Sequence, residues 1–378
     1  MTYAAIDVTD FRNATNAMIA RYHAAEQAGQ RVIPNAAIAA FSPEVFQLIG
    51  YPHRIFDARE MWRYHDVMQD GRLVENLRLI GHEMDGQLDI IRETAAVIMR
   101  FSEENFGFRS AGTDMLSRAV YQYSLIETVL SGVPKPWKIL EVGPGCGYLG
   151  VMLGLSGHSY SALEASQAFW IYQNALFRFV FGPEYTDGLS DEEESRIRHL
   201  PWWGFCAESY KLPRLTACTA NHMLAEMKAS ALVHLSRRLA SSQSDGFKVI
   251  AEDLGLCRYN EEHETLRRVV KSGFNATEVK SRVWIFERCA GQNVVRRLPN
   301  PKKQLRQRVR NMPIAGRVVT KVFELLSRAN RKRNVNLRRV VPRINAQSSS
   351  DSPDLLMKFF DELPQYRSAD ARFNDGSW

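Results

Sequence analysis

A short apolar run followed by three closely spaced glycines is the feature that most restricts how this chain can fold. Residues 137–142 (WKILEV) are largely apolar, and Gly143, Gly145 and Gly147 follow directly. An apolar run of this length bounded by glycine is typical of a buried parallel strand. The glycines allow a tight turn and a close approach of the main chain to a ligand. The segment therefore predicts a strand that runs into a ligand-binding loop and then into a helix.

Strand and helix signals alternate after this loop. Helical segments separate most of the strand candidates, which is typical of βαβ units in a doubly wound, Rossmann-like α/β sheet. Because only Ser281 and Arg282 join the last two strands, we expect a hairpin there and hence an antiparallel edge strand. The expected strands are 137–142, 160–163, 215–219, 248–251, 276–280 and 283–287, with a weaker one near 203–206, and the expected helices are 166–181, 222–238 and 261–272.

The residues before the glycine loop have helical periodicity. Apolar residues between Leu73 and Ile98 recur three or four positions apart, and residues 115–130 form a second helical segment. Glycine and proline at 132–136 then break the pattern. The predicted organisation is a helical N-terminal and lid region at 1–132, a Rossmann-like domain at 133–292, a basic arm with an amphipathic helix at 293–345, and a linker with a short helix at 346–378.

Charge is distributed unevenly along the 378 residues. The formal net charge is +7, but residues 296–343 contain 16 Lys and Arg and a single acid, Glu324, so the remainder of the chain carries −8. A basic segment of this kind is typical of a solvated arm or of one that binds an anionic lipid surface or another polyanion. RNA is less favoured, because Phe323 is the segment's single aromatic residue and stacking on bases needs more.

Hydropathy and cysteine content narrow the class of protein. Mean hydropathy is −0.29, and the longest apolar runs are far too short to span a bilayer. The start of the sequence has no basic region followed by an apolar core, so no secretory signal is expected. Five cysteines without a CxxC pair predict reduced thiols, with no disulfide framework and no metal site. Together these features favour a cytoplasmic protein.

Glu164 is placed to bind the same ligand as the glycine loop. It ends the strand after the loop, where a carboxylate can accept hydrogen bonds from both ribose hydroxyls of an adenosine group. Residues 145–150 also match the dinucleotide fingerprint GxGxxG, but Gly143 and Pro144 intervene after the strand, and the chain has no Tyr-x-x-x-Lys. The alternative pattern is Glu141-x-Gly143-x-Gly145-x-Gly147. It resembles motif I of the class I S-adenosylmethionine-dependent methyltransferases, which implies S-adenosylmethionine as cofactor, bound by these four residues and Glu164. A glycine turn without a ligand is the remaining interpretation.

The residues after the strand at 215–219 suggest the acceptor chemistry. The chain contains neither a Pro-Pro nor a Pro-Cys pair, which argues against methyl transfer to nucleobases. Asn221, His222 and Glu226 follow the strand instead. If a helix starts near 222, His222 and Glu226 share a face, and a histidine beside a carboxylate is a suitable general base for a hydroxyl. The other interpretation is that His222 only makes a structural hydrogen bond.

The arrangement as a whole resembles a bacterial family of sugar O-methyltransferases. The shared features are the helical N-terminal region, the glycine loop at 139–150 and the segment at 221–227, within a match over roughly residues 60–290. The resemblance implies methyl transfer to a hydroxyl of a sugar, a glycan or another small hydroxylated acceptor. A methyltransferase for a small natural product or for RNA, and a non-catalytic nucleoside-binding protein, remain alternatives.

Other residues near the expected site have two interpretations each. Glu252 and Asp253 end a strand and could hold a divalent ion, although a solvated strand end is favoured. The pair at 202–203, two tryptophans, could stack on a sugar or fill the core. Arg109 and Gly112 could belong to a lid over the acceptor or to an ordinary helix connection.

Overall fold

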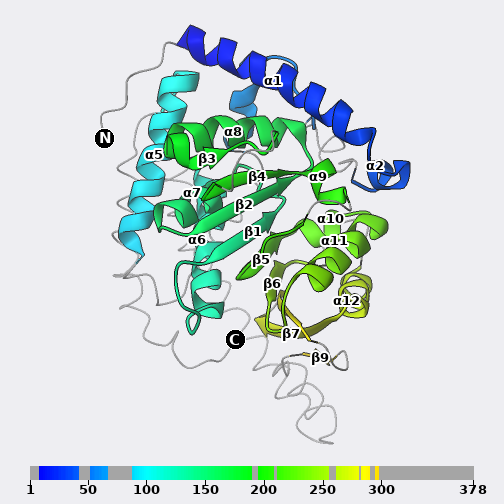
Figure 1. Ribbon diagram of the computed structural model, residues 1–378. Helices are drawn as coiled ribbons and strands as arrows, with labels where there is room; N and C mark the ends of the chain where they lie inside the picture. The colour runs from blue at the N-terminus through cyan, green and yellow to red at the C-terminus, as the bar shows by residue number, and fades with distance from the viewer. Residues whose placement is uncertain are drawn as a thin grey trace, which may run out of the picture.

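One large sheet organises the chain. The computed structural model describes residues 8–41, 52–66, 87–189, 195–207, 211–254, 261–280, 282–289 and 294–297 (Figure 1). Nine strands of this part form a sheet in the order β3-β4-β2-β1-β5-β6-β8-β7-β9. The strands are β1 (Lys138–Val142), β2 (Ser159–Glu164), β3 (Tyr185–Thr186), β4 (Ile197–Pro201), β5 (Ala217–Asn221), β6 (Lys248–Glu252), β7 (Phe274–Lys280), β8 (Val283–Arg288) and β9 (Val295–Arg296).

The strand order reverses at β1. Leu140 of β1 pairs with Ser161 of β2 on one side and with Cys218 of β5 on the other, both in parallel register. The chain therefore winds outward from β1 to β2 and β4, and later from β5 to β6 in the opposite direction. In such sheets the crevice beyond the carboxyl ends of the central strands, at the reversal, is where ligands bind. The predicted doubly wound, Rossmann-like class is confirmed.

The antiparallel strand lies towards one edge of the sheet. β7 and β8 form the expected hairpin, and β8 inserts between β6 and β7, antiparallel to both. A parallel β8 would need a long crossover, whereas a two-residue connection permits an antiparallel one. The weak strand expected at 203–206 was wrong: this segment is part of helix α9 (Trp202–Cys206), and the strand, β4, ends just before it.

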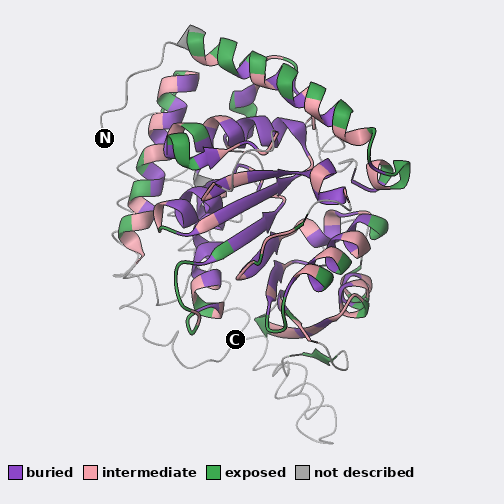
Figure 2. Ribbon diagram, viewed as in Figure 1, coloured by how far each residue is buried: buried purple, intermediate pink, exposed green. Residues whose placement is uncertain are grey.

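Helices cover both faces of the sheet (Figure 1). Right-handed crossovers in the two winding directions place α7 (Tyr148–Leu155) and α8 (Gln167–Phe181) on one face and α11 (Ala229–Ser242) and α12 (Glu262–Lys271) on the other. The single helix expected at 222–238 is divided into α10 (Met223–Glu226) and α11. The central strands β1, β2 and β5 are almost entirely buried between these layers, whereas β7 and β9 near one edge are partly exposed (Figure 2).

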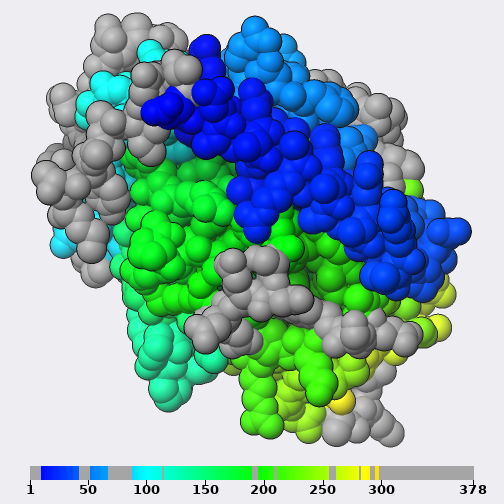
Figure 3. All heavy atoms as spheres, turned by 45° about the horizontal axis from the view of Figure 1, so that its top comes forward, coloured from blue at the N-terminus to red at the C-terminus, as the bar shows by residue number. Residues whose placement is uncertain are grey.

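The N-terminal region is helical, as predicted, and packs on the sheet domain. It contains α1 (Val8–Gln30), α2 (Asn35–Phe41), the 3-10 helix η1 (Ala58–Tyr64), α5 (Leu88–Phe106) and α6 (Thr113–Val129). α1 lies across the outside of the molecule (Figure 3), in contact with α8. Its apolar residues join the same core as the sheet. The basic arm from residue 298 onward, the linker, the C-terminal helix and the first part of the apolar stripe from Leu73 lie outside the described residues.

Two properties of the whole chain can be checked in the described part. The four cysteines within it, Cys146, Cys206, Cys218 and Cys289, are free thiols. Its helices include none that is both long enough and apolar enough to traverse a bilayer.

Candidate functional site

The glycine loop has the conformation that only glycine adopts readily. Gly143, Gly145 and Gly147 have φ angles of 69°, 60° and 77°. This left-handed region is costly for residues that carry a Cβ atom. The loop is held to the neighbouring strand by the amide of Gly143, which donates to the carbonyl of Leu163 at 2.9 Å. Gly147 is the N-cap of α7, so the strand–loop–helix unit predicted from the glycine spacing is confirmed.

Two methionine side chains lie against the loop. A Cβ atom at Gly143 would come within 2.7 Å of Sδ of Met223, and one at Gly145 within 3.3 Å of Cε of Met115. Met223 begins α10 after β5, and Met115 is in the first turn of α6. Methionine is flexible and polarizable, so these side chains can adjust to a ligand beside the loop. The sequence offers no local signal for either contact.

Glu164 ends β2 directly beside the loop. Its Oε1 accepts a hydrogen bond from the amide of Ser166 at 2.8 Å, and Gln173 donates to its Oε2 from 3.4 Å. The same Gln173 Nε2 donates to the carbonyl of Gly145 at 2.6 Å, which links the acid to the loop. Burial raises the pKa of Glu164 to about 7, and the hydrogen bonds from Ser166 and Gln173 oppose the rise. The predicted juxtaposition of the carboxylate and the glycines is therefore present.

Glu141 lies deeper than the loop. Its carboxylate is buried and accepts a hydrogen bond from the hydroxyl of Tyr160 at 2.6 Å. Tyr160 packs beneath α7, where its ring would meet a Cβ atom at Gly150 at 2.5 Å. Burial raises the pKa of Glu141 to about 7, against the effect of the Tyr160 hydrogen bond. A direct contact of Glu141 with a cofactor stays a prediction.

The segment 52–66 crosses the carboxyl ends of β1 and β2. At one end, the carbonyl of His53 accepts from the amide of Ala168 at 3.1 Å, and the amide of Ile55 donates to Gln167 Oε1 at 2.8 Å. At the other end, the carbonyl of Tyr64 accepts from Sγ of Cys146 at 3.0 Å. The N-terminal region thus closes over the β1–β2 end of the sheet.

The tryptophan pair belongs to the core. Trp202 and Trp203 are 4% and 8% exposed. Trp202 donates from Nε1 to Glu26 on α1 at 3.1 Å, and the ring of Trp203 meets that of Tyr22 edge-on, with centroids 5.2 Å apart. Of the two interpretations of this pair, core packing is the one that the structure supports.

His222 and Asp253 form a close pair at the ends of β5 and β6. Nδ1 of His222 lies 2.9 Å from Oδ2 of Asp253, and the Asp253 side chain is 5% exposed whereas that of His222 is 22% exposed. Since a carboxylate only accepts, Nδ1 carries the hydrogen, which leaves Nε2 as the basic nitrogen of the neutral ring. The carboxylate partner of His222 is thus Asp253, not Glu226 as expected. The cause is local: His222 has φ 57° and precedes the helix, so helical spacing does not apply to it.

Glu226 and Asn221 lie nearby on the same connection. Burial raises the pKa of Glu226 to about 7, and the charge of Arg118 on α6 opposes the rise. The side-chain oxygen of Asn221 is buried and has no hydrogen-bond partner. Buried polar atoms are rarely left unsatisfied, so the Asn221 oxygen is suited to a ligand. A contact between Glu226 and a substrate stays a prediction.

The remaining candidates have structural contacts. Arg109 is exposed and pairs with Glu103 at 3.1 Å, while Gly112, with φ 57°, caps α6 where a Cβ atom would meet Tyr148 Oη at 2.7 Å. Burial raises the pKa of the Tyr121 phenol, and the charge of Glu252 at the end of β6 adds to this rise. Among the residues that the structure describes, no group of three or more His, Cys, Asp or Glu is arranged to hold a metal ion.

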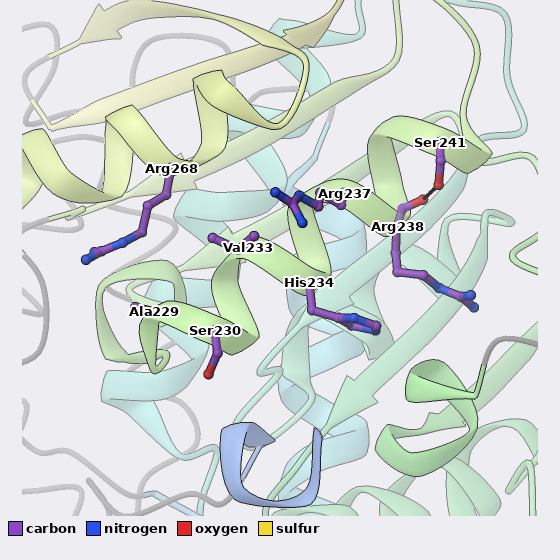
Figure 4. Close-up of a pocket in the computed structure, with 8 residues that line it drawn as sticks. All are labelled: Ala229, Ser230, Val233, His234, Arg237, Arg238, Ser241 and Arg268. Carbon is purple, nitrogen blue, oxygen red and sulfur yellow. Dashed lines mark hydrogen bonds between the residues drawn. The ribbon is translucent and has the colours of Figure 1, made fainter. Parts of the chain in front are cut away.

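A cavity of about 620 Å³ lies elsewhere, on the outer side of α11 and α12. Its basic side chains point in different directions (Figure 4). Arg268 pairs with Glu264 at 3.6 Å and Arg238 lies over the ring of Phe205, so these charges do not converge on one point. The residues that line the cavity all belong to α11 and α12 and include none of the candidate site residues. It is lined by Ala229, Ser230, Val233, His234, Arg237, Arg238, Ser241 and Arg268.

Comparison with known proteins finds likeness in structure alone. No family model matches the chain, and neither does any curated protein. A magnesium protoporphyrin IX methyltransferase from Synechocystis with bound S-adenosylhomocysteine has a TM-score of 0.33 and 11% identity, over 46% of this chain and 87% of that chain. A TehB-like S-adenosylmethionine-dependent methyltransferase from Corynebacterium glutamicum has a TM-score of 0.32 and 12% identity, over 42% and 82%.

A third solved structure, an S-adenosylmethionine-dependent methyltransferase from Methanosarcina mazei, has a TM-score of 0.33 and 11% identity, over 43% of this chain and 98% of that one. These structural neighbours are S-adenosylmethionine-dependent methyltransferases. The strand order and the glycine loop of the chain itself define its doubly wound, Rossmann-like fold.

Proposed function

We propose that this protein is an S-adenosylmethionine-dependent O-methyltransferase. The observation that carries the proposal is one of position. A left-handed glycine loop, a carboxylate beside it and a His–Asp pair all lie at the carboxyl ends of four adjacent strands, β2, β1, β5 and β6, around the reversal of strand order. A nucleoside site and a proton acceptor at one edge are what methyl transfer to a hydroxyl requires.

The residues at the β1–β2 end fit an adenosyl cofactor. Gly143 and Gly145 present bare main chain, because a Cβ atom would come within 2.7 Å of Met223 at the first position and within 3.3 Å of Met115 at the second. Glu164 is placed to accept from the ribose hydroxyls, with the long 3.4 Å contact from Gln173 as the hydrogen bond most easily exchanged. At the end of the adjacent strand β5, Asn221 offers a buried oxygen without a partner to the positively charged part of the cofactor. Bound S-adenosylmethionine supplies a reactive methyl group on a sulfonium sulfur.

The residues at the β5–β6 end would handle the proton. Asp253 holds Nδ1–H of His222, so that Nε2 can accept the proton of an acceptor hydroxyl as its oxygen gains the methyl group. The partly exposed imidazole can then release this proton to water. Since methyl transfer also depends on positioning the two reactants, His222 shares the rate enhancement with the walls of the site.

The proposed acceptor is a hydroxyl of a sugar, a glycan or another small molecule. The His–Asp pair supports a hydroxyl, because alcohols must lose a proton when they are methylated, and the resemblance of residues 221–227 to sugar O-methyltransferases supports a carbohydrate. An anionic surface bound by the basic arm stays a prediction, because residues 298–343 of that arm lie outside the described part.

The test separates cofactor binding from turnover. Calorimetry with S-adenosylhomocysteine should give a saturable heat, and methyl-labelled S-adenosylmethionine should label at least one member of a panel of glycans, nucleotide sugars and hydroxylated natural products. Absence of heat at high ligand excess would contradict the proposal at its root. Binding without labelling of any hydroxyl, but with labelled RNA, would retain a methyltransferase and replace the acceptor.

A further inference from the structure

Three residues with strained main chain meet at the end of β6. In the described part of the chain, His222, Asp253 and Arg282 are the non-glycine residues with positive φ, at 57°, 54° and 67°. They come from three separate connections: the end of β5, the end of β6 and the turn of the β7–β8 hairpin. Left-handed main chain costs free energy in residues with a Cβ atom, and it persists where the surrounding structure fixes it.

Asp253 joins the other two. Its Oδ2 is 2.9 Å from Nδ1 of His222, and its Oδ1 is 3.6 Å from Nη1 of Arg282. Its main-chain amide also donates to the carbonyl of Arg282 at 3.0 Å. The carboxylate is 5% exposed, whereas Arg282 is 56% exposed and approaches from the solvent side. Each oxygen of the carboxylate therefore has a different neighbour, Oδ2 the imidazole and Oδ1 the guanidinium, the latter at ion-pair and not hydrogen-bond distance.

The topology explains how Arg282 reaches this position. β8 is antiparallel to β6, and Val283 pairs with Glu252, the last residue of β6. The hairpin turn before Val283 must then lie at the carboxyl end of β6, beside Asp253. If β8 were parallel to β6, it would begin at the opposite edge of the sheet, and its first residues would lie far from the site.

We propose that Arg282 is a positioning residue for His222. It fixes the Asp253 carboxylate so that the carboxylate holds Nδ1–H of His222 and keeps Nε2 free for the acceptor hydroxyl. The catalytic part of this inference rests on the proposed O-methyltransferase function, whereas the effect on the imidazole tautomer does not. Arg282 thereby gives the antiparallel hairpin a role in the site as well as in the sheet.

The first measurement does not depend on activity. ¹⁵N spectra of the histidine-labelled full chain, recorded at a pH where imidazole is neutral, should show Nδ1–H for His222, assigned by its loss in His222→Asn. Arg282→Asn removes the charge and retains a residue that tolerates left-handed main chain. It should raise the fraction of the Nε2–H tautomer, and Arg282→Lys should leave the spectrum close to that of the unmodified protein. An unchanged tautomer in Arg282→Asn, or an equal change in both variants, would overturn the proposal.

The second measurement uses turnover, once an acceptor is known. Arg282→Asn should lower kcat about 5- to 10-fold, a modest effect because the ion pair is partly exposed, with unchanged affinity for S-adenosylhomocysteine. Arg282→Lys should recover most of the loss. Equal loss in both variants, accompanied by the same fall in Tm, would reduce Arg282 to a structural residue. If no acceptor is ever methylated while the tautomer shifts as expected, the proposed function fails and the positioning role stands.

Discussion

The two ends of the carboxyl edge are built differently. At the β1–β2 end, Glu164 is buried and the glycine loop is buried or half-buried, both are hydrogen-bonded to main chain, and the segment 52–66 lies over them. At the β5–β6 end, His222 and Arg282 are partly exposed, and the contacts are between side chains on strained connections. The first end is the more enclosed of the two, which suits the proposed cofactor. The second is more exposed to solvent, which suits the proposed acceptor.

This difference predicts that substitutions at the two ends separate binding from turnover. Changes at the β1–β2 end should weaken the cofactor, whereas changes at the β5–β6 end should lower the rate and leave cofactor affinity alone. A result in which either end affected both properties equally would contradict the division.

The largest effect is expected for His222→Asn. Asparagine tolerates the left-handed main chain, so the variant removes the base without adding strain. Because general base catalysis typically contributes about 10²- to 10⁴-fold, kcat should fall by roughly 10²-fold or more. Calorimetry should give the same affinity for S-adenosylhomocysteine as the unmodified protein. Turnover within about 2-fold of the unmodified protein would assign His222 to structure, since a base contributes far more than that.

The next effect is expected for Gly143→Ala. The new Cβ atom would meet Met223 at 2.7 Å, in a residue with φ 69°. We expect cofactor affinity to fall about 10- to 100-fold, because relieving the contact with Met223 must shift the loop, while the left-handed main chain adds a stability cost of about 1–2 kcal/mol. Isothermal calorimetry measures the loss.

A matched control for Gly143→Ala is Gly157→Ala. Gly157 has φ 80°, but nothing lies within 4 Å of its added Cβ atom, and it is in the turn between α7 and β2. The control should lose a similar amount of stability and no affinity. Equal weakening of the cofactor in both variants would mean that general destabilisation, and not the loop, explains the result.

The same division separates what the sequence could predict from what it could not. The loop and Glu164 lie within one βαβ unit, so glycine spacing and strand ends were enough to place them together. Asp253 and Arg282 reach His222 only through the sheet, and no local pattern indicates that. The helical spacing of His222 and Glu226 was misleading because the helix begins one residue later.

The misplaced strand has a similar explanation. Residues 202–206 are rich in aromatic residues, which favour strands, but Trp202 and Trp203 pack against α1 as part of a short helix. β4 itself is mostly buried, but it contains Arg198 and His199, and these polar residues are not typical of a buried strand. His199 can be buried in this strand because its ring nitrogens form hydrogen bonds with Gln173 and Tyr185, at 2.8 Å and 2.6 Å. Tertiary contacts thus decide both segments.

A smaller effect, and one that depends on pH, is expected at Glu164. Burial raises its pKa to about 7, so the carboxylate is mostly ionised at pH 8 and mostly protonated at pH 6. The ionised form is the better acceptor for ribose hydroxyls, so affinity for S-adenosylhomocysteine should fall about 10-fold from pH 8 to pH 6. Glu164→Gln should bind about 10-fold more weakly at pH 8 and lose this pH dependence, because an amide oxygen accepts less strongly than a carboxylate. A pH dependence retained in the variant would assign it to another group.

The smallest effect is expected at Glu141, and it tests whether the enclosed end has an outer and an inner layer. Like Glu164, Glu141 is a buried acid with a pKa raised to about 7, but its partner is Tyr160 beneath α7. A raised acid pKa means that the folded state holds its proton more tightly than the unfolded state. Stability therefore falls as pH rises from about 4.5 to 7 and stays level above that. Glu141→Gln removes this loss, so relative to its effect at pH 5 it should stabilise the protein at pH 8 by about 2–3 kcal/mol. Comparing the two pH values by chemical denaturation cancels the constant cost of burying an amide.

Affinity of Glu141→Gln for S-adenosylhomocysteine should stay within about 2-fold of the unmodified protein, as expected for a residue that supports the loop without touching the ligand. A 10-fold weakening would instead place Glu141 in contact with the cofactor, as the motif in the sequence first suggested, and the enclosed end would then be a single layer.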